Sequence, residues 1–393
     1  MRRPYRDEAV SLICAMKIPM TLALRIVMLG IALCTSALAQ DRSAVINSEK
    51  HSFRLVTLLP GLENPWSVAF LPDGRMLVTE RAGRLRLVGQ DFRLDPKPIA
   101  GLPDVVSQGQ GGLFDVVLHP EYAQNGWIYW AYNAPGAGGW GTALARGKLQ
   151  GLRMTEVQVL FSMQPKTRSS QHFGGRIVFD RAGMLYLTLG DRGDKDRAQK
   201  LDDHAGSVIR LHDDGRVPAD NPFAKRAGAL PEKWTLGNRN MQGAALHPKT
   251  GELWTHEHGP QGGDEVNVMR SGLNYGWPVI TYGVDYSGAP ISMENKRDGM
   301  EQPLVYWVPS IAPSSMVLYT GNLFPQWKGD LLVSALAGQQ IRRLDLENGA
   351  VKAQETLLAE REERYRAIIQ APDGSLIVLT DDPEGKVLRL SPN

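Results

Sequence analysis

The chain has 393 residues, of which 42% are hydrophobic, and its 44 basic and 42 acidic residues leave a formal charge of +2. This length is sufficient for one large all-β domain or for two ordinary domains. The charge is nearly balanced and no block of like charges stands out, which excludes nucleic acid as an expected partner. The 41 glycines and 25 prolines indicate many strands joined by turns.

The first 39 residues are predicted to be a secretory signal peptide. Basic residues precede the apolar run 26–33, and the small residues Ala37 and Ala39 form a cleavage site. A retained membrane anchor is the alternative, but the apolar run is short for a span. We therefore expect cleavage after Ala39, no stable membrane insertion, and a periplasmic or secreted single domain of residues 40–393. Both cysteines lie in this leader, so the mature chain would have no thiol and no disulfide.

The rest of the sequence contains a weak repeat, in which a turn with Pro, Asp or Gly precedes a short strand six times. The strands after these turns are predicted at 76–79, 127–130, 185–188, 253–255, 330–333 and 376–379. Six such units favour an all-β fold, a six-bladed β-propeller of four-stranded antiparallel blades. A two-sheet sandwich is the competing all-β architecture. Because the spacings in the middle are the longest, the insertions there are expected to form loops around the central opening.

The first candidate for chemistry is His172, which precedes Gly174 and Gly175. These glycines let another group approach the backbone closely. Asp191 lies in the turn after the predicted strand 185–188. If the two flanking strands are antiparallel neighbours, Asp191 and His172 lie at the same end of one hairpin. An acid in that position orients the imidazole and supports it as a general base; a purely structural histidine is the alternative.

Polar and glycine-rich clusters recur between residues 234 and 278, beginning with Arg239 and Asn240 after a strand-breaking glycine. Arginine is well suited to hold an anionic or carbonyl oxygen. A loop arginine in an ordinary salt bridge is the other interpretation.

The His-Glu-His triplet at 256–258 suggests zinc, since both imidazoles would face the same way on a strand. A catalytic zinc site needs a third ligand, and the sequence has no HExxH helix. Calcium is favoured instead, because Gly259 and Pro260 offer two successive carbonyls on a stiff turn and hard cations prefer oxygen. Glu265 and the backbone near Tyr275 are candidates for a second oxygen-rich site, unless the acid is simply solvated.

Near the C-terminus, Arg364 and Arg366 would share one face of a strand. Two neighbouring cations need an anionic ligand or acidic side chains to compensate them. Glu362 and Glu363 are the structural candidates for that compensation.

Nine motifs in this order carry a family resemblance: GQGGL (109–113), His172 with GR (175–176), GDRG (190–193), GNRNMQG (237–243), HGP (258–260), DEVN (264–267), NYGWP (274–278), IAPSS (311–315) and RYR (364–366). Together they resemble the soluble glucose and aldose sugar dehydrogenases that depend on pyrroloquinoline quinone (PQQ). The resemblance covers about residues 58–390. It implies a six-bladed propeller with PQQ over the central opening.

The resemblance also implies roles for particular residues. Matching the family's catalytic positions are His172 as base, Asp191 as its support and Arg239, which with calcium polarises the quinone. The positions that contact PQQ are Gln110, His172, Arg239, Asn240, Arg364 and Arg366, the last two on its carboxylates. The carbonyls of Gly259 and Pro260 match ligands of the calcium that bridges protein and PQQ. Glu265 and Tyr275 match a second, structural calcium site.

The implied reaction is hydride transfer from the anomeric carbon of an aldose sugar to PQQ, with His172 taking the hydroxyl proton. The product would be a lactone, and the electrons would pass to an unidentified periplasmic acceptor. The loops after Tyr275 are shorter than in the glucose enzymes, which indicates the aldose branch, an open cleft and a monomer.

One departure affects the cofactor site. Ala337 stands where the family has a lysine, so another cation, such as Lys166 or Arg168, would have to replace it for PQQ to bind well. This loss favours one alternative, a non-catalytic propeller that binds a protein. A calcium-dependent lactonase is the other alternative, although such sites use side-chain acids rather than main-chain carbonyls.

Overall fold

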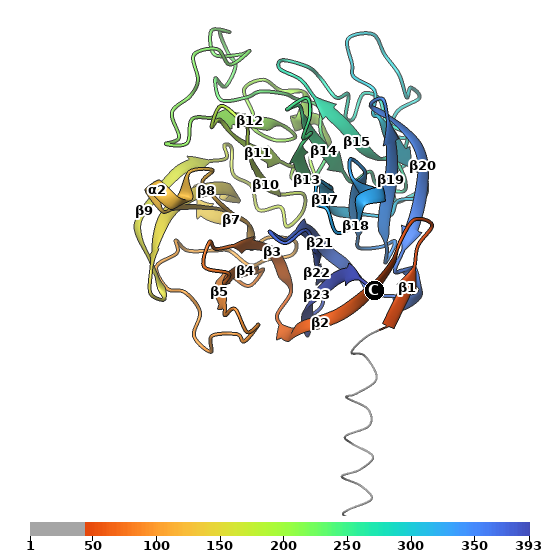
Figure 1. Cartoon of the computed structure of the whole chain (residues 1–393). Helices are drawn as coiled ribbons and strands as arrows, with labels where there is room; N and C mark the ends of the chain where they lie inside the picture. Colours follow the sequence, from red (N-terminus) through yellow and green to blue (C-terminus); the bar gives the residue numbers. More distant parts are fainter. Residues whose placement is uncertain (1–43) are drawn as a thin grey trace, which may run out of the picture. The chain divides into compact units, whose positions relative to one another are not determined.

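The computed structural model describes residues 44–393. The predicted signal peptide, residues 1–39, lies outside the described residues, so its cleavage stays a prediction. Residues 44–393 form six antiparallel sheets arranged around a central axis (Figure 1). The predicted six-bladed propeller is therefore confirmed. Among these residues, no helix has the length and apolar composition needed to cross a bilayer.

The blades follow one another along the chain, and each begins with its innermost strand. Blade 1 contains β3 (Pro65–Phe70), β4 (Met76–Glu80) and β5 (Arg84–Val88). Blade 2 contains β6 (Leu113–Leu118), β7 (Trp127–Gly136), β8 (Gly139–Gln150) and β9 (Arg153–Ser162). Blade 3 contains β10 (Gly174–Phe179), β11 (Leu185–Leu189) and β12 (Val208–Leu211).

The second half of the ring is built in the same way. Blade 4 contains β13 (Met241–Leu246), β14 (Leu253–Glu257), β15 (Asp264–Met269) and β16 (Val305–Trp307). Blade 5 contains β17 (Pro313–Leu318), β18 (Leu331–Ala335), β19 (Ile341–Glu347) and β20 (Ala350–Leu357). Blade 6 contains β21 (Tyr365–Gln370), β22 (Leu376–Thr380), β23 (Gly385–Pro392), β2 (Ser52–Leu62) and β1 (Ala44–Asn47).

Two blades have a reduced outer edge, and the helices are short. In blade 1 the fourth strand is replaced by isolated bridges from Leu94 and Ile99, and in blade 3 by one from Lys233. The helical segments are α2 (Tyr122–Asn125), η1 (Lys195–Gln199), η2 (Pro325–Trp327) and η3 (Ala359–Arg361).

The repeated turns of the sequence connect the first and second strands of the blades. In three of them an aspartate accepts a hydrogen bond from the backbone two residues on: Asp73, Asp180 and Asp373. The glycine that follows has a positive φ, 83° at Gly74 and 88° at Gly374, which favours glycine. The second strands β4, β11, β14, β18 and β22 are buried throughout. All except β14 begin with three or more apolar residues, and such runs are visible in sequence.

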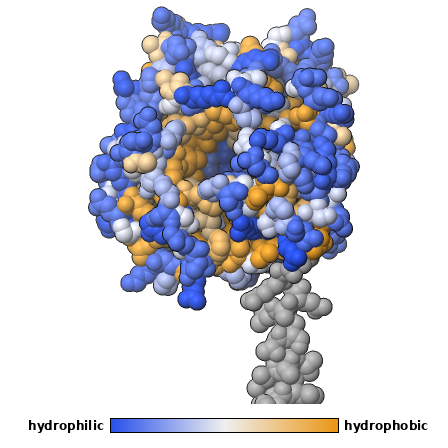
Figure 2. Space-filling model, viewed as in Figure 1, coloured by the Kyte–Doolittle hydropathy of each residue, from blue (hydrophilic) through white to orange (hydrophobic). Residues whose placement is uncertain are grey.

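The six innermost strands close a ring. Each packs against the innermost strand of the next blade, and β21 packs against β3. All six have a bulge within their first few residues. A bulge re-aims the neighbouring side chains, and here it lies next to the loops that precede these strands. The space-filling view shows a hollow near the centre of the ring, with apolar residues on its wall (Figure 2).

The side chain of Arg176 connects five blades at the centre of this ring. It starts on β10 in blade 3, and its guanidinium lies 4.2 Å from the ring centroid of Trp66 in blade 1. It donates to Asp115 of blade 2 and to the backbone carbonyls of Gln242 and Ser314, in blades 4 and 5, each at 3.1 Å. A fully buried charge needs this complete set of partners.

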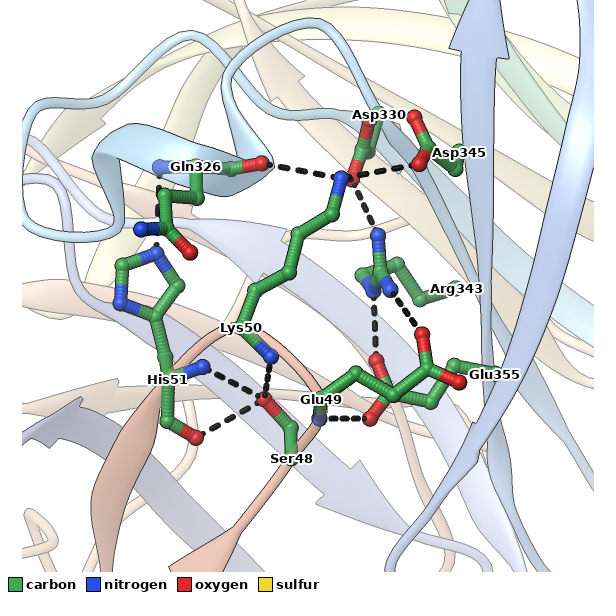
Figure 3. Close-up of polar contacts among 9 residues, drawn as sticks. All are labelled: Ser48, Glu49, Lys50, His51, Gln326, Asp330, Arg343, Asp345 and Glu355. Atoms are coloured by element: carbon green, nitrogen blue, oxygen red, sulfur yellow. Dashed lines mark hydrogen bonds and ion pairs between the residues drawn. The ribbon is translucent and has the colours of Figure 1, made fainter.

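The N-terminal hairpin of β1 and β2 closes the propeller and also contacts blade 5. Strand β2 pairs with β23, and Phe53 packs edge-on against Trp327 at 5.7 Å. Beside it lies an ion-pair cluster (Figure 3), centred on Arg343, which is 1% exposed and pairs with Asp330 and Glu355 at 2.7 Å. Glu49 and Lys50 of the hairpin turn join this cluster.

We expect Arg343→Met to lower the free energy of unfolding by about 3 kcal/mol, because two buried carboxylates lose their counter-charge. Denaturant unfolding measures this change. The matched control is Lys352→Met, whose pair with Glu347 is 60% exposed on both sides; it should cost less than about 1 kcal/mol. Equal stability of the two variants would contradict a role for the buried cluster.

Candidate active site

The predicted site residues gather at one end of the propeller. Adjacent strands are antiparallel, so the start of each innermost strand and the end of the second strand lie at the same face. His172 precedes β10 and Asp191 follows β11, while Arg239 and Asn240 precede β13. Arg364 precedes β21. The propeller thus brings together loops of blades 3, 4 and 6, and the far ends of the strands carry the repeated turns instead.

A cavity of about 460 Å³ opens at this face, here called the mouth cavity. Its lining residues are Gln171, His172, Asp191, Gly193, Asp194, Lys195, Asp196, Arg239, Pro260, Trp277, Asp285, Tyr286 and Ile291. The segments 193–196 and 277–291 belong to the long middle connections of the chain, which were expected to surround the opening.

His172 and Asp191 form a buried pair in the wall of the mouth cavity. Strands β10 and β11 are antiparallel, and Nδ1 of His172 lies 2.6 Å from Oδ1 of Asp191. Burial would raise the pKa of Asp191, but its hydrogen bonds with His172 and the backbone N–H of Gly193 lower it overall. The ionised carboxylate can only accept, so Nδ1 of His172 carries the proton and Nε2 is left as an acceptor.

The imidazole is kept neutral by its surroundings. Burial lowers the pKa of His172, and the charges of Arg239 and Arg192 act in the same direction, whereas Asp191 opposes them. The backbone of His172 has φ 51° and its N–H donates to Oε1 of Gln110 at 2.9 Å. This backbone conformation is uncommon for a residue other than glycine, and it places the ring beside Asp191. Because the imidazole is unprotonated at neutral pH, it can act there as a base.

Trp277 fixes the other oxygen of Asp191 and was not singled out by the sequence. Its Nε1 donates to Oδ2 of Asp191 at 2.8 Å, and the guanidinium of Arg239 lies 5.4 Å from its ring centroid. The side chain of Trp277 therefore contacts both the carboxylate of Asp191 and the guanidinium of Arg239. The NYGWP motif was visible, but no local signal connects it to an acid 86 positions earlier.

Arg239 and Asn240 occupy the loop between Asp191 and the turn at Gly259. Nη1 of Arg239 donates to the carbonyls of His258 and Gly259 at 3.1 and 3.0 Å. Oδ1 of Asn240 accepts from the N–H of Gly174 at 3.2 Å, while its buried Nδ2 has no partner. An unpartnered buried donor beside a cavity is a position where a ligand oxygen can bind.

A second, very small cavity of about 10 Å³ adjoins Arg239, Glu257, Glu265 and Tyr275. Burial raises the pKa of both Glu257 and Glu265, and the charge of Glu257 adds to the shift of Glu265. Glu257 accepts from Nδ2 of Asn238, whereas the carboxylate of Glu265 accepts from Nδ2 of Asn267 at 3.2 Å. The hydroxyl of Tyr275 donates to the carbonyl of Val268, which leaves its backbone carbonyl as the available ligand.

The two histidines of the 256–258 triplet have different surroundings. His256 lies on β14 and is fully buried, and neither ring nitrogen has a hydrogen-bond partner among the described residues; burial lowers its pKa to about 3. His258 follows the strand, and Nε2 lies 2.6 Å from the carbonyl of Pro313. Burial also lowers the pKa of His258 well below its usual value, so both rings are neutral.

A third cavity of about 150 Å³, the central cavity, lies at the axis. Its lining residues are Trp66, Arg81, Gln110, Phe114, Phe173, Gly174, Gln242, His258, Leu336, Arg364, Arg366 and Asp381. Arg366 donates to Oε1 of Gln242 at 2.8 Å, and its buried Nε has no partner.

The positive charges of Arg364 and Arg366 are balanced by an acid other than the two candidates in the sequence, Glu362 and Glu363. Both arginines pair with Asp381, at 2.9 and 3.2 Å. Glu363 pairs with Lys386 at 2.7 Å instead. The hairpin of β21 and β22 places Asp381 beside the arginines, so the partner comes from the next strand rather than from the adjacent sequence.

The cations suggested as replacements at position 337 do not line the central cavity. Lys166 is buried, and its ammonium donates to the carbonyls of Ala134 and Pro135 at 3.0 and 2.9 Å. Ala337 itself is exposed. The cavity instead contains Arg81, which the sequence analysis missed.

The side chains of the described residues do not by themselves identify a metal centre. Within residues 44–393, no group of three or more His, Asp or Glu side chains converges as a metal site. The candidate ligands at Gly259, Pro260 and Tyr275 are main-chain carbonyls, which such a count does not include.

Comparison with known proteins supports one family. The profile of the glucose/sorbosone dehydrogenase family matches residues 62–389. The aldose sugar dehydrogenase YliI of Escherichia coli (strain K12) is 41% identical over 367 residues, covering 92% of this chain and 96% of the relative.

Solved structures agree with that assignment. The crystal structure of a glucose dehydrogenase is 46% identical with a TM-score of 0.84, covering 86% of this chain and 99% of its own. The PQQ-bound form of an aldose sugar dehydrogenase from Streptomyces coelicolor is 26% identical with a TM-score of 0.71, covering 89% and 97%.

We expect Asp191→Asn to lower the pKa of His172 further, because the negative charge that stabilises the imidazolium is lost. NMR titration of the histidine side chains measures this shift. The control is Asp180→Asn, which lies in the turn at the opposite end of the same hairpin and should leave the pKa of His172 unchanged. An unshifted His172 in the Asp191 variant would mean that the pair is not formed in solution.

Proposed function

The chain belongs to the glucose/sorbosone dehydrogenase family, and from this premise we propose that it oxidises the anomeric carbon of aldose sugars to lactones with PQQ and calcium as cofactors. The observation that carries the proposal is the buried His172–Asp191 pair at the mouth cavity, close to a central cavity rich in arginine. As a member of this family, the protein is an oxidoreductase that acts on sugars.

The central cavity fits PQQ, an ortho-quinone with three carboxylates. It contains three arginines against the single carboxylate of Asp381, so it has an excess of positive charge for an anion to balance. The buried Nε of Arg366 and Nδ2 of Asn240 lack partners, and both are donors that carboxylate or quinone oxygens would satisfy. Gln110, Arg239 and Arg364 complete the proposed cofactor contacts.

Calcium fits two places. The proposed main-chain ligands are the carbonyls of Gly259, which accepts from Arg239, and of Pro260, a residue that lines the mouth cavity. Glu265 and the carbonyl of Tyr275 adjoin the small cavity, where neither Glu257 nor Glu265 forms an ion pair with another described residue. Hard cations prefer this oxygen-only chemistry, and a cation there would offset the repulsion between Glu257 and Glu265.

When bound, PQQ supplies a quinone carbon that accepts a hydride from the anomeric carbon of the sugar. Side chains of the protein accept the proton that leaves the sugar together with the hydride. Nε2 of His172 accepts it from the anomeric hydroxyl, and Asp191 stabilises the imidazolium that forms. Arg239 would place positive charge beside the oxygen that becomes negative during transfer. The sugar thus loses one hydride and one proton and becomes a lactone.

The mouth cavity fits a small polar substrate. Asp194, Asp196 and Asp285 lie at its edge and can accept hydrogen bonds from sugar hydroxyls, while Trp277 and Tyr286 offer aromatic surface. We further propose that the protein acts as a monomer after export to the periplasm and passes electrons to an acceptor there. The predicted signal peptide supports this location.

We expect the purified apo-protein to oxidise aldoses only after PQQ and Ca²⁺ are added together, measured with an artificial electron acceptor. Each cofactor alone should give no turnover, because PQQ needs the cation to be bound productively. Absence of PQQ binding at micromolar concentration would contradict the proposal.

We expect His172→Ala to bind PQQ while losing turnover by about 100-fold or more, the usual contribution of a positioned base. Steady-state kinetics and a separate PQQ titration measure the two effects. His212→Ala, in a turn at the opposite face, is the matched control and should keep full activity. Unchanged turnover in the His172 variant would place the base elsewhere.

A further inference from the structure

We propose that Arg81 is a further cofactor-binding arginine, which holds a carboxylate of the ligand in the central cavity together with Arg364 and Arg366. This inference rests on the proposed function, since PQQ is the anion that the experiment uses. It assigns a role to a residue that lies outside all nine motifs of the sequence.

The backbone of Arg81 is held firmly at the cavity. Arg81 follows β4, its N–H donates to the carbonyl of Asn64 at 3.1 Å, and its carbonyl accepts from Leu113 at 3.2 Å. Gly112 approaches so closely that a Cβ there would lie 1.9 Å from the Arg81 carbonyl oxygen. Blades 1 and 2 therefore fix the point from which the side chain starts.

The side chain is oriented without being neutralised. Nη1 of Arg81 donates to the carbonyl of Gly109 at 2.7 Å. Within the described part of the chain no carboxylate forms an ion pair with Arg81, whereas Arg364 and Arg366 share Asp381. A guanidinium has five donors, so most of its hydrogen-bonding capacity stays available for a ligand.

The charge balance of the central cavity calls for an anion. Among the residues that line the cavity, Arg81, Arg364 and Arg366 contribute three positive charges against the one negative charge of Asp381. Arg81 lies close enough to Arg366 for their charges to repel. Burial is the main cause that lowers the pKa of Arg366, and the charges of Arg364 and Arg81 lower this pKa further. A ligand with two or more carboxylates would remove this repulsion.

Position 337 provides an independent reason for a cation at this place. An exposed alanine stands there, next to Leu336, which lines the central cavity. The family resemblance implied a lysine at that position. Arg81 lines the same cavity from blade 1 and supplies positive charge that blade 5 lacks.

The test measures PQQ binding to the apo-protein in the presence of Ca²⁺, by calorimetry and without turnover. Arg81→Gln should raise the Kd about tenfold or more, the usual effect of losing a hydrogen bond to a charged group. Arg81→Lys keeps the charge and should lose less. The control is Arg75→Gln, at the other end of blade 1, where Arg75 pairs with Asp73; its Kd should equal that of the wild type.

Two further measurements separate ligand binding from a structural role. The Kd of Arg81→Gln should depend less on salt concentration than that of the wild type, because one charge contact is missing. Adding Ala337→Lys to Arg81→Gln should recover affinity. Thermal unfolding of the apo-proteins should be similar for all variants.

Two outcomes would overturn the inference: a Kd of Arg81→Gln within twofold of the wild type, or a loss of affinity that follows a loss of apo-protein stability and is not recovered by Arg81→Lys or Ala337→Lys. If the wild type itself fails to bind PQQ, the proposed function fails as well, so the two failures are distinguishable.

Discussion

The guanidinium of Arg176 lies at the centre of the ring of innermost strands and contacts residues from four other blades. Because the charge is fully buried, every blade that supplies a partner must keep its register relative to β10. Arg176 and its partners lie within the bulges at the start of their strands. The loops that carry the candidate site are therefore positioned by this buried network, together with contacts among the loops such as Trp277 with Asp191 and Arg239 with Gly259.

Two electrostatic environments lie above that network. In the mouth cavity, a carboxylate with hydrogen bonds from His172, Gly193 and Trp277 stays ionised and keeps the imidazole in one tautomer. In the central cavity, arginines exceed acids and leave donors without partners. The first arrangement suits proton transfer and the second suits a polyanion. Gln110 connects them, since it lines the central cavity and accepts from the backbone of His172.

Local sequence patterns predicted the elements that depend on local physics. The turns with Asp and Gly need a side-chain acceptor and a positive φ, and the second strands of the blades begin with short apolar runs, so both were found. The pairing of His172 with Asp191 was also predicted, because a single hairpin brings them together. Of the two compensations considered for Arg364 and Arg366, the structural one by Glu362 or Glu363 was wrong, since Asp381 arrives from the neighbouring strand; the anionic ligand stays a proposal.

The sequence by itself determined the all-β character, the six-fold repeat and the pairing of His172 with Asp191, because turn chemistry, strand hydrophobicity and hairpin neighbours are encoded within short stretches. Only the tertiary structure decided which groups converge across blades. Trp277 meets Asp191, Arg81 meets Arg366, and Lys166 points to backbone carbonyls instead of the cavity. These contacts depend on the closure of the ring and on the bulges that re-aim side chains, and no short segment contains that information.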